Sequence, residues 1–137
     1  MNNITVNSEL FDLHVNLNTG GLSVLGTKKP YYGKVVKHCD TARVYNPTLR
    51  VRQGGNARAV KEKRRNVHAF VRGVADTAAN VEAELKSSRY RVIRYNPFMH
   101  DYFFDAENEK KVIGGEIAVL KGKIMKILNP IYDEQLF

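Results

Sequence analysis

The chain has 137 residues, 43% hydrophobic and 26% charged, with a formal net charge of +8 at pH 7. This composition indicates one globular domain and excludes a disordered chain. The single cysteine, Cys39, excludes an intrachain disulfide and disfavours a thiolate zinc site. No signal-peptide pattern and no apolar run of roughly 20 residues is present, so we expect neither secretion nor a membrane helix.

The first section reads as short antiparallel strands. Apolar and polar residues alternate over 11–15 and 22–24 on either side of the turn signal Asn18-Thr19-Gly20-Gly21, which predicts a hairpin after a short strand at 4–6. Further strands are expected at 35–36, 42–45 and 48–52, and Asn46-Pro47 is expected to stop the strand at 42–45.

The central section changes character after Gly54-Gly55. Asn56 can cap a helix over 57–65, a strand follows over 67–72 and ends at Gly73, and a second helix is expected over 77–86. The section is therefore predicted to be a helix–strand–helix insert.

The third section repeats the first in outline. Strands are predicted at 90–95, 102–104, 112–113, 117–120 and 124–128, the last two joined by the turn Lys121-Gly122-Lys123. The predicted fold is α+β: two small antiparallel β-meanders, with a possible internal duplication, flanking the short insert. Two unrelated meanders would give the same order. We assign residues 1–128 to a single domain and 129–137 to an apolar tail that docks on the domain or on a neighbouring subunit.

The net charge is concentrated in one segment. Residues 43–72 hold nine cations and one acid, Glu62, whereas the rest of the chain has thirteen of each. A charge concentrated in this way predicts a polyanionic partner. The candidate phosphate-binding residues are Arg50, Arg52, Arg58, Lys61, Arg64, Arg65 and Arg72, and those for stacking on a base or reading its edge are Phe70, His68 and Asn66.

Each candidate also has a purely structural interpretation. The basic run 61–65 can be a solvated helix face, and Asn66 with His68 can be an internal hydrogen-bonded pair. Gly54-Gly55-Asn56 can cradle an anion or simply turn the chain. The aromatic positions 98, 100, 102 and 104 can be core or a partly exposed platform. Because adjacent strand residues point to opposite faces, His38 is not expected to activate Cys39.

Several short motifs resemble a small basic protein family of phages, prophages and bacteria that carries no named function. They are N-x-x-x-G at 16–20, VVKH at 35–38, RRNVHAFVRG at 64–73, YNP at 95–97 and YFF at 102–104. The resemblance spans roughly residues 11–128 and implies a phage or mobile-element genome. It carries over no catalytic residues.

We therefore expect a non-enzymatic, phage-associated protein in the bacterial host cytoplasm, without cofactor or metal. Its basic centre would hold nucleic acid or a phosphorylated nucleotide, as a regulator or as a sponge for a nucleotide signal in counter-defence. The alternative is a structural virion or protein-interaction component that uses the basic face and the apolar tail. A small hydrolase or nuclease is disfavoured because no acid–base constellation is present. A homo-oligomer is expected in either case, and the sequence leaves the ligand and the stoichiometry open.

Overall fold

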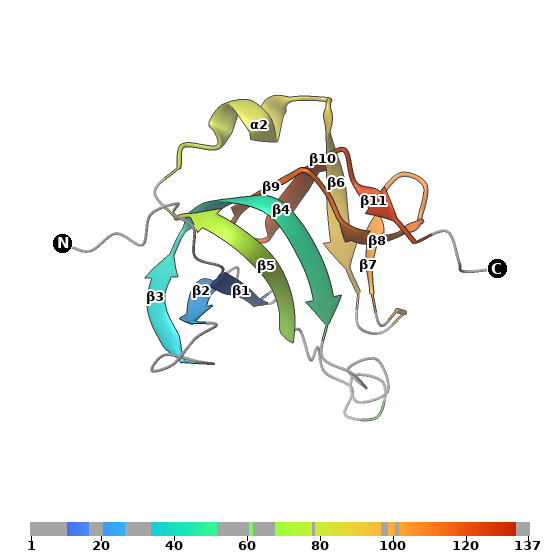
Figure 1. Ribbon diagram of the computed structural model, residues 1–137. Helices are drawn as coiled ribbons and strands as arrows, with labels where there is room; N and C mark the ends of the chain where they lie inside the picture. The colour runs from blue at the N-terminus through green and yellow to red at the C-terminus, as the bar shows by residue number, and fades with distance from the viewer. Residues whose placement is uncertain are drawn as a thin grey trace.

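The computed structural model shows a protein built almost entirely of β-strands over the residues it describes (Figure 1). These residues are 11–16, 21–26, 34–51, 61, 68–77, 79–96, 99–100 and 102–133. The strands are β1 (Phe11–Asn16), β2 (Gly21–Gly26), β3 (Val35–Cys39), β4 (Thr41–Val51), β5 (His68–Asp76), β6 (Tyr90–Tyr95), β7 (Phe103–Asp105), β8 (Lys111–Gly114), β9 (Ile117–Lys121), β10 (Ile124–Leu128) and β11 (Ile131–Tyr132). A short helix, α2 (Glu82–Lys86), joins β5 to β6.

Six of these strands close into an antiparallel barrel. The order of hydrogen-bonded neighbours is β8-β7-β6-β10-β9-β4, and β4 pairs back with β8 through Thr48 and Gly114. The ring therefore has no free edge, which removes the main route by which exposed strands aggregate.

The ring closes because β8 and β9 behave as one bent strand along β4. Thr48 lies opposite Gly114 and Thr41 lies opposite Lys121, in a single register. At the bend, a Cβ on Gly115 would lie 2.2 Å from Ile127 Cγ2, so a side chain there would collide with the core. The bend lets β8 pair with β7 while β9 pairs with β10.

The pairings of the first half follow the same order as those of the second. β1 pairs with β2 and β5, β2 with β3, and β5 with β4, as β6 pairs with β7 and β10, β7 with β8, and β10 with β9. β3 leads into β4 across Asp40, just as β8 leads into β9 across two residues. The long strand β4 belongs to both halves.

Alternate residues of the strands point inward and form one continuous apolar core. Its fully buried members include Leu13, Leu22, Val44, Val71, Phe103, Leu120 and Ile127. On the outside of β9, Ala79 and Val81 pack against Val119, and Leu85 of α2 contacts this smaller cluster. The segment that carries α2 therefore covers one outer patch of the barrel.

The predicted α+β fold is wrong. β5 is hydrogen-bonded to β4 on one side and to β1 on the other, so it is a full member of the sheet rather than the strand of an insert. The second predicted helix, 77–86, shortens to Glu82–Lys86. The first, 57–65, lies outside the described residues except for Lys61, whose backbone is helical.

The predicted strand stop at Asn46-Pro47 is also wrong, because β4 runs through it. Asn46 adopts a positive φ of 51°, and the register against β5 shifts there, which marks a β-bulge. Asn46 N still donates to Glu116 O at 2.8 Å, and Pro47 O accepts from Gly115 N at 3.2 Å. Pro47 has no N–H to donate, and at the bulge the hydrogen bonds between the strands use only its carbonyl oxygen.

Candidate nucleic-acid interface

A cation and an aromatic ring meet on the outer face of β4 and β5. Arg50 lies opposite Phe70 in the register, and its guanidinium carbon is 4.5 Å from the ring centroid. Both side chains point outward because their neighbours Leu49, Ala69 and Val71 are buried. This geometry is a cation–π contact on a sheet surface.

Arg72 continues the same outer face. It lies two residues along β5 from Phe70 and opposite Thr48 of β4, and it is half-buried. The structure therefore brings together Arg50, Arg72 and Phe70, three of the residues predicted for this site.

The other predicted residues lie in the sequence from Arg52, which follows β4, to His68, the first residue of β5. Arg52, Arg58, Arg64, Arg65, Asn66 and the side chain of His68 are outside the described residues, as is Gly54-Gly55-Asn56, and Lys61 is exposed. β4 and β5 pair from Arg43–Asp76 to Val51–Ala69. In the sequence, the connecting segment follows Val51 of β4 and precedes His68 of β5, so its cations adjoin these two strands along the chain.

Arg43 belongs to the same basic stretch but has an intramolecular role. Its guanidinium forms an ion pair with Glu84 of α2 and donates to Asn80 O at 3.0 Å. This arginine therefore anchors the segment around α2 rather than adding to a binding surface.

A second group of cations and rings lies on the outer face of β6, β7 and β8. Arg94 lies opposite Phe104, which lies opposite Lys111. The Lys111 ammonium is 5.4 Å from the Tyr102 ring centroid, and the His100 ring stacks on Tyr102 at 4.6 Å. The partly exposed alternative for the aromatic positions fits Tyr102 and Phe104, whereas Phe103 is the core residue of β7.

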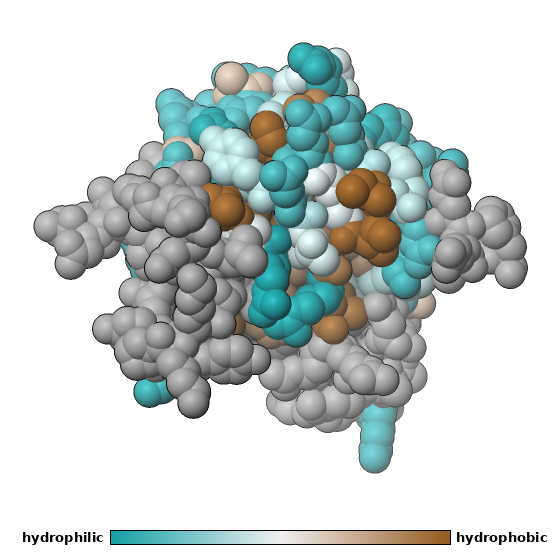
Figure 2. Space-filling view, viewed as in Figure 1, coloured by the Kyte–Doolittle hydropathy of each residue, from teal (hydrophilic) through white to brown (hydrophobic). Residues whose placement is uncertain are grey.

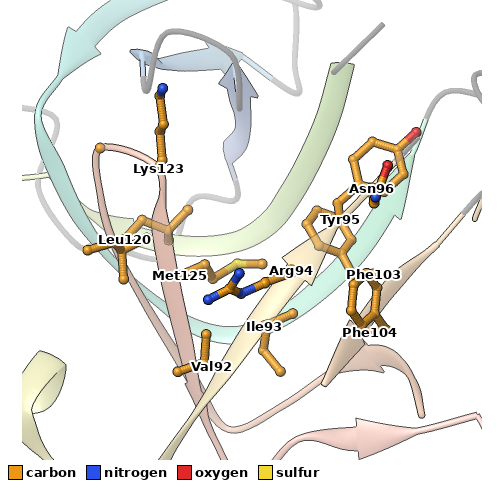
Figure 3. A pocket seen from close by; sticks show the side chains of 12 residues that line it. Val92, Ile93, Arg94, Tyr95, Asn96, Phe103, Phe104, Leu120, Lys123 and Met125 are labelled. Carbon is orange, nitrogen blue, oxygen red and sulfur yellow. The ribbon is translucent and has the colours of Figure 1, made fainter. Parts of the chain in front are cut away.

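A pocket of about 390 Å³ opens beside this group, between the end of β6 and the start of β10. Its lining includes Arg94, Lys123, Asn96, Phe104 and Ile124. In Figure 3 the Arg94 guanidinium lies among the labelled side chains, whereas the Lys123 ammonium extends away from them.

Figure 2 shows hydrophobic side chains on the surface in small groups separated by hydrophilic ones.

The His38-Cys39 pair does not form a nucleophile and its base. His38 is exposed, and its Nδ1 lies 3.0 Å from Ser23 Oγ. Cys39 packs on the core, and burial raises the pKa of its thiol to about 11 against the opposing effect of Lys37. The thiol therefore stays protonated at neutral pH. Within the described residues, no three His, Cys, Asp or Glu side chains are grouped to hold a metal ion.

Asp105 is fully buried and is held by structural contacts. Its carboxylate accepts two hydrogen bonds from Arg91, at 3.0 and 3.2 Å, and one from Tyr132 Oη at 2.7 Å. Burial alone would raise its pKa, but the bonds from Arg91, from the backbone of Glu107 and from Tyr132 lower it. This acid is therefore ionised and engaged at neutral pH.

The sequence interpretation missed Arg94, Lys111 and Lys123 because they lie outside the basic stretch. The alternation in YRVIRY, where Arg94 stands between Ile93 and Tyr95, was the available signal for an outward-facing cation. Nothing in the sequence indicates that this arginine opens onto a pocket.

A family model described as Mycobacterium phage L5 gene 82 protein matches residues 7–127. The chain belongs to this family. The predicted resemblance to a phage protein family is confirmed to that extent. Searches of curated proteins and of solved structures found no match to this member of the gene 82 family. None of the helical segments in its described residues has the length and hydropathy needed to cross a bilayer.

Proposed function

We propose that this gene 82 family protein is a non-enzymatic binding protein that holds single-stranded nucleic acid on the outer face of β4 and β5, in the cytoplasm of the bacterial host. The observation that carries the proposal is the Arg50 guanidinium 4.5 Å above the Phe70 ring. In the sequence, the basic segment 52–67 joins the two strands that hold these residues. Cations neutralise phosphates, and exposed rings stack on bases without regard to sequence.

The openness of this surface favours a strand over a small nucleotide. Arg50 and Thr48 are exposed on a sheet face, whereas recognition of one small ligand calls for a concave site. Among the roles considered for the protein, this surface supports a nucleic-acid-binding regulator better than a sponge for a nucleotide signal.

The test is binding of a fluorescent twelve-residue oligothymidylate, followed by anisotropy at several salt concentrations. Phe70→Ala is expected to weaken binding on the order of tenfold, because stacking contributes roughly 1–3 kcal/mol per base. Arg50→Gln is expected to reduce the magnitude of the log–log salt slope by about 0.7. Arg89→Gln, a change of an exposed arginine in the turn before β6, is the matched control and is expected to have little effect.

Binding that is unchanged in Phe70→Ala and Arg50→Gln would contradict the proposal. If no oligonucleotide binds even at low salt, the structural alternative takes over. The observation that favours it is Ile131, which is 53% exposed on the two-residue strand β11. An apolar side chain there can pack against a second subunit or another protein, and sedimentation of Ile131→Ser against the wild type would detect the loss of an oligomer.

A further inference from the structure

The pocket between β6 and β10 exists because their pairing stops early. β1 pairs with β5 over six positions, from Phe11–Gly73 to Asn16–His68. The corresponding strands β6 and β10 pair over four, from Tyr90–Leu128 to Ile93–Met125. Beyond Ile93 the chain continues through Arg94 and Tyr95 without a partner in β10.

The tight turn between β9 and β10 limits how far β10 extends along β6. β9 ends at Lys121 and β10 begins at Ile124, so only Gly122 and Lys123 lie between them. In the register of the ladder, Ile124 is the first residue of β10 and would stand opposite Arg94, so β10 has no residue to face Tyr95. Consecutive side chains from Val92 to Asn96 line the gap, so residues of both faces of β6 border it: Ile93 and Tyr95 are buried, and Val92 and Arg94 are exposed.

The gap combines a cation with apolar and aromatic surface. Its lining includes the rings of Phe104 and Tyr95, the exposed side chains of Val92 and Ile124, two cations, and no carboxylate among the described residues. Arg94 is exposed and, within the described part of the chain, has no ion-pair or hydrogen-bond partner for its guanidinium. Its planar group suits bidentate contact with a phosphate.

We infer that this pocket binds one nucleotide unit, an aromatic base joined to a phosphate. Arg94 holds the phosphate, Phe104 and the apolar rim contact the base, and Lys123 adds positive potential at the mouth. A volume of about 390 Å³ fits one such unit, since ligand pockets start at about 300 Å³. The unit is either a free nucleotide or the phosphorylated end of a strand.

This site is separate from the β4–β5 face. Gly122 N donates to Asp40 O, which places the β9–β10 turn at the start of β4, whereas Arg50 lies near its end. The pocket can therefore be occupied whether or not the β4–β5 face binds a strand.

The experiment is a ¹H–¹⁵N NMR titration of the full chain with AMP, adenosine, inorganic phosphate, and tetradeoxyadenylate with and without a 5′-phosphate. AMP is expected to shift the amides of 92–96 and 122–125 saturably, and to bind more tightly than adenosine or phosphate. A 5′-phosphorylated tetramer that binds these amides more tightly than AMP identifies a strand end. Equal affinity of AMP and the tetramer identifies the free nucleotide.

Two variants and two controls separate the site from general charge effects. Arg94→Gln is expected to weaken AMP binding by roughly tenfold or more, the effect of removing a hydrogen bond to a charged group. Arg89→Gln is expected to leave it within about twofold, because solvated charges contribute little. Phe104→Leu keeps an apolar side chain but is expected to weaken AMP more than phosphate. Phe70→Ala, which alters the other site, is expected to leave the AMP-induced shifts of the pocket amides 92–96 and 122–125 unchanged.

Three results would overturn the assignment. They are the absence of AMP-induced shifts at 92–96 and 122–125, equal AMP affinity of Arg94→Gln and the wild type, and phosphate binding as tight as AMP. Loss of oligothymidylate binding in Phe70→Ala concerns only the β4–β5 face, so failure of one site is distinguishable from failure of the other.

Discussion

At the scale of single residues, the partners of each cation decide what it can do. Lys121 pairs with Glu82, Lys111 lies 3.3 Å from Asp133, and Lys126 donates to the Leu85 and Ser87 carbonyls at the end of α2. These cations are engaged within the fold. The contacts join residues far apart in the sequence, so a count of charges along the chain could not separate structural cations from surface ones.

Arg43 tests this distinction, because it belongs to the basic stretch but pairs with Glu84. Arg43→Gln is expected to lower the free energy of unfolding by roughly 1 kcal/mol, as expected for a partly exposed ion pair. It is expected to leave the oligothymidylate salt slope unchanged. Urea denaturation and anisotropy measure the two effects, and a flattened slope in this variant would show that Arg43 contacts phosphate.

The Asp105 cluster predicts a pH dependence of stability. Burial acts to raise the pKa of Asp105, but the bonds from Arg91 and its other donors outweigh burial, so this pKa is lower in the folded chain than in the unfolded chain. Its contribution is therefore fully present above the unfolded pKa of about 4 and is lost as the pH falls from there through the folded pKa. Urea denaturation from pH 7 to pH 3 is expected to show this loss in the wild type.

Asp105→Asn is expected to cost about 2 kcal/mol at pH 7, less than a fully buried pair, because Arg91 is 31% exposed and keeps Glu107. The variant is also expected to lose part of the pH dependence. Glu107→Gln is the matched control, since Glu107 is 76% exposed, and its effect is expected within about 0.5 kcal/mol. Equal pH profiles for Asp105→Asn and the wild type would contradict the assignment.

At the scale of elements, local patterns located most strands. The predictions at 90–95 and 124–128 coincide with β6 and β10, and the turn at 121–123 joins β9 to β10 as expected. Alternation of apolar and polar residues involves only neighbouring residues, so it can be recognised in the sequence alone. Whether a strand is bonded on one side or on both depends on partners far along the chain, which is why the predicted insert was wrong for β5.

Asn46 and Pro47 show a second limit of local patterns. This dipeptide usually ends a strand because proline lacks an N–H. Here the bulge leaves Pro47 at a position where no N–H is needed. A Cβ on the facing Gly73 would lie 2.7 Å from Tyr45 O, so the bulge requires a glycine there. The continuation of β4 thus depends on a glycine more than twenty residues away, which no nearby residue indicates.

The β9–β10 turn predicts an effect that is purely conformational. Gly122 has a φ of +58°, and a Cβ built there has no neighbour within 4 Å. Gly122→Ala is therefore expected to cost about 1 kcal/mol through backbone strain alone. Gly122→Asn is expected to cost less, because asparagine tolerates this region. Thermal denaturation ranks the three proteins, and an alanine variant as stable as the wild type would contradict the explanation.

At the scale of the whole molecule, the two halves differ most in one connection. Their pairings follow the same order, but β4 and β5 are joined by residues 52–67, whereas Gly122 and Lys123 alone join β9 and β10. The long connection carries Arg52, Arg58, Lys61, Lys63, Arg64 and Arg65. The second half has the same order of pairings with a two-residue turn, so we expect this order of strands to tolerate removal of the charged segment.

This difference predicts that the charge can be removed without loss of the fold. Replacing residues 53–67 with Asn-Gly leaves Arg52 and His68 to flank a two-residue hairpin, next to the observed Val51–Ala69 pair. The variant is expected to keep its β-strand NMR signals and its AMP-induced shifts at 92–96. Its oligothymidylate affinity is expected to fall, and the magnitude of its salt slope is expected to fall by about 0.7 for each phosphate that the segment neutralises in the wild type. An unfolded variant would show that the segment is needed for folding, and an unchanged slope would show that its cations do not bind the strand.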